Sequence, residues 1–162
     1  YDGKAKGEVS YPDVAKYVPE TEFVVKVIDR EVKAANCNLK SAPIIVSGGY
    51  GMGSKEGFNM LYQLAEELHA EVGASRAAVD SGWVDPSRQI GQTGVTVHPK
   101  VYIACGISGQ IQHVVGMQDA GIIISVNSDP NAPINKIADY VIVGTVEDVV
   151  PKLIKHYKQN TK

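Results

Sequence analysis

The sequence contains little cysteine, no long apolar run and no excess of charge of either sign. Its 162 residues include only Cys37 and Cys105, too few for a disulfide scaffold and not spaced as a metal-binding or CxxC redox pair. No apolar stretch approaches the roughly 20 residues that span a bilayer, and the polar residues 1–8 do not resemble a signal peptide. We therefore predict no direct membrane insertion and an intracellular, reducing compartment.

Basic and acidic side chains are nearly balanced, at 16 and 18, which gives a formal net charge of -2. A nucleic-acid-binding domain usually concentrates basic residues, whereas these charges are spread along the chain, so we predict no nucleic-acid partner. The four histidines show no metal-ligand spacing, and no Ser-His-Asp, Cys-His or paired-carboxylate arrangement stands out. We therefore predict neither a metal site nor a catalytic residue.

Length and a hydrophobic content of 44% suit a single globular domain with a substantial core. Residues 1–22 are polar and without a sustained period, so they are interpreted as a lead-in segment, and residues 23–162 as the folded domain. The chain does not begin with methionine, which suggests a fragment or a processed product.

From residue 23 onward, short apolar runs alternate with amphipathic stretches. Continuous apolar or β-branched runs predict strands, and they lie at residues 23–32, 42–46, 101–105, 122–126 and 140–143. Each of the later runs leads into a turn of small or polar residues and then into a helical stretch.

Three stretches have helical spacing. The first carries an apolar face made of Phe58, Leu61, Leu64, Ala65 and Leu68. A second helix is predicted over residues 110–117, with Ile111, Val114 and Val115 at helical intervals. A last helix is predicted from a capping pair, Thr145 and Asp148, to about Tyr157, with a kink or short break at Pro151.

Strands that are apolar throughout predict a parallel sheet with helices on both faces, an α/β, doubly wound, Rossmann-like fold. Such sheets bind ligands outside the carboxyl ends of their strands. Here these ends carry small and polar residues, at 48–53, 106–109, 127–129 and 144–145. We therefore expect a ligand site along this edge.

The loops at this edge leave several interpretations open. The glycine-rich loop at 47–54 matches neither GxGxxG nor the P-loop pattern, so a structural turn and a phosphate-binding loop are equally compatible with it. Arg76 is either a solvated side chain or a partner for an anion or a flat ring. The loop at 89–94 could wrap a heteroaromatic ring or form a plain turn. Ser108 and Gly109 stand where a helix N-terminus could hold a pyrophosphate.

Together these segments resemble the C-terminal, FAD-binding domain of the alpha subunit of electron-transfer flavoproteins. The resemblance is carried by residues 46–49, 72–80, 90–94, 102–113, 124–134 and 138–140, in order and spacing from about residue 25 to 150. It implies a Rossmann-like sheet, of the type that deoxyhypusine synthase and related NAD/FAD-binding proteins share, with FAD held in an extended pose. It also implies that the full subunit has an N-terminal domain that this chain lacks.

The resemblance also implies roles for individual residues. Ser75 and Arg76 match positions beside the flavin, and the Thr93 hydroxyl matches one near flavin N5. His113 is expected near the flavin carbonyl at C2, and Asn127 towards the adenosine half. The full predicted FAD site consists of Tyr50, Ser75, Arg76, Ile90, Gly91, Gln92, Thr93, Ser108, Gly109, Gln110, Ile111, Gln112, His113, Asn127 and Thr145.

Two of these positions depart from the family pattern. Tyr50 stands where many members have arginine, and Thr145 stands where an acidic residue is common. We expect both departures to affect the phosphate and adenosine end rather than the flavin. Around the flavin, positive charge and hydrogen bonds from Arg76 and His113 are expected to favour the reduced form and so raise its potential.

The resemblance implies an electron carrier rather than a substrate-converting enzyme. Its implied partners are a beta subunit and flavin dehydrogenases of the acyl-CoA type, with an NADH-linked, bifurcating type as a further possibility. Its implied location is the bacterial cytoplasm rather than the mitochondrial matrix. One alternative is an NAD(P)-binding enzyme domain of the same fold, which would not need Arg76, Thr93 and His113 together. Another is a nucleotide-binding module with no redox role.

Overall fold

A computed structural model describes residues 7, 10–13, 16–17 and 38–161. The chain divides into two compact units, residues 1–34 and 35–162, and the fold described here is that of the second unit. The predicted strand at 23–32 and the predicted domain boundary between residues 22 and 23 lie outside the described residues.

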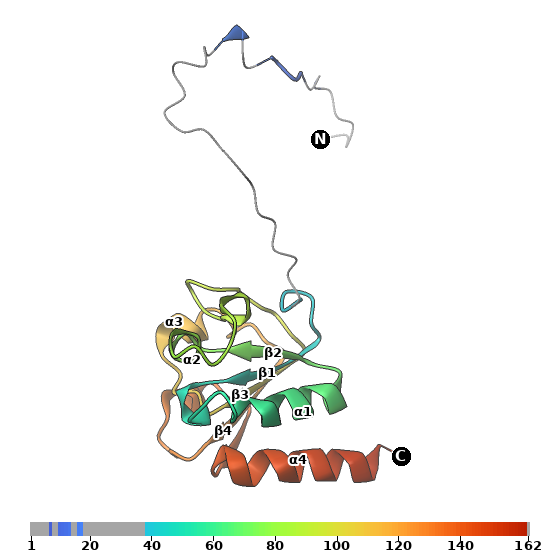
Figure 1. Ribbon diagram of the computed structural model, residues 1–162, viewed down its shortest axis with the longest axis vertical. Coiled ribbons are helices and arrows are strands. Elements are labelled where there is room, and N and C mark those ends of the chain that lie inside the picture. Colours follow the sequence, from blue (N-terminus) through green and yellow to red (C-terminus); the bar gives the residue numbers. More distant parts are fainter. Residues whose placement is uncertain (1–6, 8–9, 14–15, 18–37, 162) are drawn as a thin grey trace. The chain divides into compact units, whose positions relative to one another are not determined.

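The core of this unit is a five-stranded parallel sheet (Figure 1). Its strands are β1 (Ile44–Gly48), β2 (Glu71–Ala74), β3 (Val101–Cys105), β4 (Ile122–Asn127) and β5 (Tyr140–Val143), in the spatial order β2-β1-β3-β4-β5. The chain order therefore reverses between β1 and β3, as in doubly wound folds. This confirms the predicted fold class and four of the predicted strands.

Strand β2 was not predicted. It contains only four residues, Glu71–Ala74, and two of them are glycine and alanine. Only Val72 brings a large apolar side chain to the core. Its place in the sheet comes from parallel pairing with β1, in which Val46 lies opposite Val72, and a local apolar pattern cannot reveal such pairing.

One face of the sheet is covered by the two long helices, α1 (Phe58–Leu68) and α4 (Val146–Asn160), which lie side by side in Figure 1. The predicted apolar face of α1 is buried against β1 and β2, except that Leu68 is only partly buried. Short elements lie between the strands elsewhere: η3 (Tyr50–Met52), α2 (Arg76–Asp80) and η4 (Pro86–Arg88).

The other face is covered by shorter segments. They are α3 (Ile111–Val114), η5 (Pro133–Lys136) and the loop from residue 89 to 99. Buried side chains from these segments, including Ile90, Val97 and Ile134, pack on Ile45 and Tyr102 of the sheet. This arrangement brings the loop at 89–94 and α3 together over β3.

Two helix predictions were partly wrong. The helix predicted over 110–117 is confined to α3, and Ile111 and Val115 are 69% and 39% exposed, because the buried side of this turn is occupied by His113. Of the predicted kink or short break at Pro151, the break is absent, since α4 runs from Val146 to Asn160 without interruption. Pro151 is exposed, so the Glu147 carbonyl that loses its helical partner can be hydrated.

The predicted start of α4 is confirmed. Thr145 is its N-cap residue, and the Thr145 hydroxyl accepts a hydrogen bond from the Asp148 backbone N–H at 3.3 Å. Within the described part of the chain, no helix combines the length and hydrophobicity needed to cross a membrane.

Candidate functional site

A cleft of about 850 Å³ lies at the carboxyl ends of the strands. Its walls come from the segments that follow all five strands, so it runs along the sheet edge where a doubly wound fold binds its ligand. The volume is within the range of small-molecule and cofactor sites. All the predicted site residues except Gly109 and Ile111 line this cleft.

Gly109 and Ile111 lie outside the cleft for different reasons. Gly109 is buried against η5, where a Cβ atom would stand only 2.3 Å from the backbone nitrogen of Ile134, and its φ of +90° also favours glycine. Ile111 points its side chain into solvent. Both residues shape the segment between β3 and α3 without lining the cleft, and their predicted contact with the cofactor stays a prediction.

The glycine-rich loop after β1 is organised by contacts with the loop after β3. The backbone N–H of Gly49 donates to the Cys105 carbonyl, and that of Gly51 donates to the Gly106 carbonyl, both at 2.9 Å. A Cβ atom on Gly49 would lie 2.3 Å from the Gly106 oxygen. The glycines therefore allow two backbones to touch, which favours the structural interpretation of this loop over the phosphate-binding one.

The segment before α3 differs from the loop after β1 in its backbone hydrogen bonding. Within the described part of the chain, the backbone N–H groups of Ser108, Gly109 and Gln110 donate to no other backbone group. Ser108 and Gln110 line the cleft, and α3 begins directly after Gln110. Free N–H groups at the start of a helix can bind an anion, so this segment can receive the pyrophosphate of a dinucleotide.

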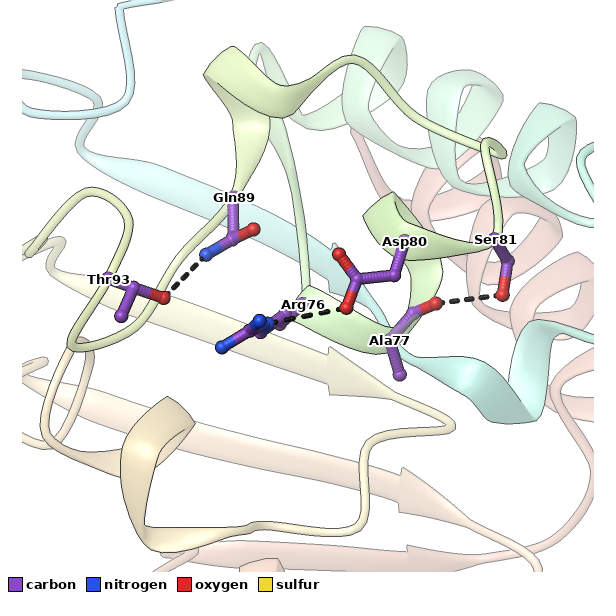
Figure 2. Close-up of polar contacts among 6 residues, drawn as sticks. All are labelled: Arg76, Ala77, Asp80, Ser81, Gln89 and Thr93. Carbon is purple, nitrogen blue, oxygen red and sulfur yellow. Dashed lines mark hydrogen bonds and ion pairs between the residues drawn. The ribbon is translucent and has the colours of Figure 1, made fainter.

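Two polar pairs stand at the β2 end of the cleft, and Figure 2 shows both. The Arg76 Nε lies 3.3 Å from the Asp80 carboxylate, with both side chains largely exposed. The Gln89 amide donates a 3.0 Å hydrogen bond to the Thr93 hydroxyl. Ser75 is the N-cap residue of α2, but its side chain makes no capping hydrogen bond to the helix.

The charges around the cleft are unevenly distributed. Of the described residues, Arg76 is the only lysine or arginine that lines it, whereas three acidic residues do: Asp80, Asp129 and Glu147. A bound pyrophosphate would therefore be held mainly by backbone N–H groups. Among the side chains that the structure describes, lysine or arginine charge lines the cleft only at the β2 end, where the resemblance places the flavin.

His113 is the most constrained of the predicted residues. Its Nδ1 lies 3.0 Å from the Ile90 carbonyl oxygen and its Nε2 lies 2.9 Å from the Tyr102 hydroxyl. Burial lowers the pKa of His113 to about 4, against an opposing effect of the hydrogen bond with Ile90. The ring is therefore neutral at physiological pH, so positive charge near a flavin would come from Arg76 and not from His113.

The remaining predicted residues also have defined contacts. The Asn127 amide donates to the Ile107 carbonyl at 2.8 Å and accepts from the Asp129 N–H at 3.0 Å. The Thr145 hydroxyl is 3.0 Å from the Asp148 carboxylate. Tyr50 is 66% exposed and stacks on Trp83, with ring centroids 5.3 Å apart.

Several lining residues were not among the individual residues named for the FAD site, although six of them lie in loops that the sequence places at this edge of the sheet. They are Gly51, Ala77, Asp80, Gln89, Gly106, Ile107, Ser128, Asp129, Ala132, Pro133, Val146 and Glu147. The places of three of these residues could have been predicted, because Ser128 and Asp129 directly follow Asn127 at a strand end and Asp80 lies one helical turn after Arg76. The places of Ala132 and Pro133 could not, because these residues reach the cleft through the long-range hydrogen bond from the Ile134 N–H to the Ser108 carbonyl.

These features fit an elongated dinucleotide with a flat redox ring. The cleft extends past five strands, it has free backbone donors near its middle, and it has a cation with hydroxyl and amide groups at one end. An apolar backing for a flat ring comes from buried Ile90 and Ile107.

Comparison with known proteins agrees with this fit. The family model of the electron transfer flavoprotein FAD-binding domain matches residues 38–118. The chain is 54% identical over 158 residues to the electron transfer flavoprotein subunit alpha of Bacillus subtilis, covering 98% of this chain and 48% of that protein. It is 50% identical over 143 residues to the same subunit of Thermoanaerobacterium thermosaccharolyticum, covering 88% and 43%.

Among solved structures, a protein described as a thiamin diphosphate-dependent enzyme from Mycobacterium smegmatis is similar over 72% of this chain and 25% of that one, at 13% identity and a TM-score of 0.47. The chain spans about half the length of the curated relatives it matches. From the family match and the geometry of the cleft, we conclude that the chain belongs to the family of electron transfer flavoprotein FAD-binding domains, whose cofactor is FAD.

Proposed function

We propose that this domain holds FAD in the cleft and acts as the electron-carrying part of an electron transfer flavoprotein. The observation that carries this proposal is the convergence of Ser75, Arg76, Gln92, Thr93 and His113, from three separate segments, on one end of one cleft. When bound there, FAD would supply one- and two-electron redox chemistry.

The residues of the chain would position and tune the cofactor. Arg76 would place positive charge beside the ring and so favour its more negative, reduced form, while Asp80 would partly offset that charge. The Thr93 hydroxyl already accepts a hydrogen bond from Gln89, so it remains free to donate its own proton to a ring nitrogen. Ser108 and Gln110 would offer backbone N–H groups to the pyrophosphate.

The wider assignment follows the relatives. Because the alpha subunits that this chain resembles belong to two-subunit flavoproteins, we propose a beta subunit as its partner, with flavin dehydrogenases, including the acyl-CoA type, as electron donors. A bacterial, cytoplasmic location is supported by the Bacillus and Thermoanaerobacterium relatives. An NADH-linked, bifurcating role would need a second flavin on the partner subunit.

The test is an absorbance titration of the purified chain with FAD, with NAD as the competing ligand, followed by stepwise reduction with dithionite. The proposal predicts flavin bands that shift on binding, that survive gel filtration with the protein, and that bleach and return on reduction and reoxidation. A chain that ignores FAD and binds NAD would instead be an enzyme domain of the same fold, and the proposal would be wrong.

A further inference from the structure

Tyr102 is a fully buried residue of β3 that does not line the cleft, yet it contacts a residue that does. Its ring lies against that of His113, with centroids 6.2 Å apart, and its hydroxyl is 2.9 Å from His113 Nε2. Burial raises the pKa of the Tyr102 hydroxyl, so Tyr102 keeps its proton and can donate it.

The direction of the hydrogen bonds follows from the partner on the other side of the ring. The Ile90 carbonyl can only accept, so His113 Nδ1, at 3.0 Å, must carry the proton. Since the ring is neutral, Nε2 carries none and accepts from the Tyr102 hydroxyl. Two consecutive hydrogen bonds therefore connect the Tyr102 hydroxyl, through the His113 imidazole, to the Ile90 carbonyl.

This pair of hydrogen bonds ends at the loop that carries Gln92 and Thr93. The loop is fixed to α3 at two consecutive places: Ile90 through the His113 ring, and the Gln92 N–H through a 2.7 Å bond to the Gln112 carbonyl. Gly91 between them packs so closely that a Cβ atom would lie 2.7 Å from that same Gln112 oxygen. Any rotation of the His113 ring would release the first of these attachments.

We propose that Tyr102 is a positioning residue: by donating to Nε2 it holds the His113 ring in the orientation in which Nδ1–H binds the Ile90 carbonyl, and it thereby sets the loop at 90–94 in the place from which it contacts the cofactor. This lock, the hydrogen bonds that join Tyr102, His113 and Ile90, is a property of the protein alone. Its effect on FAD rests on the proposed function above.

The first test needs no variant. The chain has four histidines, so long-range proton–nitrogen NMR spectra at pH 7 can assign the protonated nitrogen of each ring. We expect His113 to be protonated at Nδ1 and bare at Nε2. Protonation at Nε2 would overturn the proposal, whatever the variants do.

The second test uses Tyr102→Phe, which removes the hydroxyl and keeps the ring. The matched control is Ser125→Ala, which removes another buried hydroxyl on the same face. That hydroxyl donates to Asn135 at 2.7 Å, whereas the ring nitrogens of His113 bond to Tyr102 and Ile90. Because one hydrogen bond to the His113 ring is lost, we expect the Gln92 amide of Tyr102→Phe to exchange with solvent about fivefold faster. Equal exchange in the two variants would overturn the proposal.

A third variant separates positioning from simple loss of stability. His113→Asn places an amide donor where Nδ1 stood, so it can still reach the Ile90 carbonyl without help from Tyr102. Adding Tyr102→Phe to His113→Asn should then change Gln92 exchange no further. Full additivity of the two substitutions would mean that Tyr102 does not act through His113.

A last experiment compares the FAD affinity and the reduction potential of bound FAD in Tyr102→Phe and Ser125→Ala. We expect weaker affinity and a shifted potential only in Tyr102→Phe. Unchanged values in both would overturn the link from the lock to the cofactor. If the wild-type chain bound no FAD, the proposed function would fail, while the tautomer and exchange results would still decide whether the lock exists.

Discussion

Arg76 and Asp80 form an ion pair one helical turn apart on α2, with the Arg76 Nε 3.3 Å from the Asp80 carboxylate, and both side chains line the cleft. Arg76, the only lysine or arginine among the described residues that line the site, is thus already paired with an anion. Because both side chains are largely exposed, the pair contributes little to folding. We infer that the pair adjusts the electrostatic potential at the position proposed for the cofactor.

Substitutions of these two residues should therefore shift the reduction potential of bound FAD in opposite directions. Arg76→Ala removes positive charge and should lower the potential, whereas Asp80→Asn unmasks it and should raise the potential. Each shift should reach tens of millivolts, where about 59 mV is a tenfold change for one electron. Spectroelectrochemical titration measures both. Lys158→Ala, which breaks an ion pair with Glu67 on the other long helix, should leave the potential unchanged.

Thr93 should affect the chemistry of the cofactor more than its binding. Thr93→Val removes the hydroxyl, and with it both the Gln89 hydrogen bond and any donor to a ring nitrogen, whereas Thr93→Ser keeps them. We expect Thr93→Val to shift the reduction potential by tens of millivolts with nearly unchanged FAD affinity, and Thr93→Ser to behave as wild type. If Thr93→Val abolished binding, the loop would be structural instead.

His113 should make the stability of the fold depend on pH. Its pKa is about 4 in the folded chain and near 6.5 when unfolded, so the unfolded chain takes up a proton first as the pH falls. Stability is then complete above about pH 6.5 and falls towards pH 4, by about 2 kcal/mol at pH 5. Urea unfolding at pH 7 and pH 5 measures this loss, and His113→Asn should remove that part of the pH dependence. An unchanged difference in the variant would assign it to other groups.

The loop after β1 should tolerate a methyl group at one glycine and not at another. Gly49→Ala would place its Cβ 2.3 Å from the Gly106 oxygen, whereas no heavy atom stands within 4 Å of the corresponding position on Gly53, whose φ is +74°. We expect Gly49→Ala to cost at least about 3 kcal/mol of unfolding free energy, and Gly53→Ala only about 1 kcal/mol of backbone strain. Equal losses would mean that the two backbones do not touch as described.

Much of this fold follows from local sequence, and the exceptions have physical reasons. Strands β3 and β4 are continuous apolar runs buried between two layers, so their pattern predicts them, whereas β2 offers only Val72 and depends on its pairing with β1. The resemblance to a known family pointed to residues that, apart from Gly109 and Ile111, line one cleft. It could not place the His113 ring, because its partners lie 23 and 11 residues away in Ile90 and Tyr102.

The central claim is that FAD occupies the cleft at the carboxyl edge of the sheet. Amide NMR spectra of the labelled chain, recorded with increasing FAD, test it most directly. We predict shifts in the segments that line the cleft, at 75–76, 90–93, 108–113, 127–129 and 145–147, with little change along the exposed face of α4 around Lys155. Shifts confined to the exposed face of α4 around Lys155, or an unchanged spectrum at saturating FAD, would contradict the account.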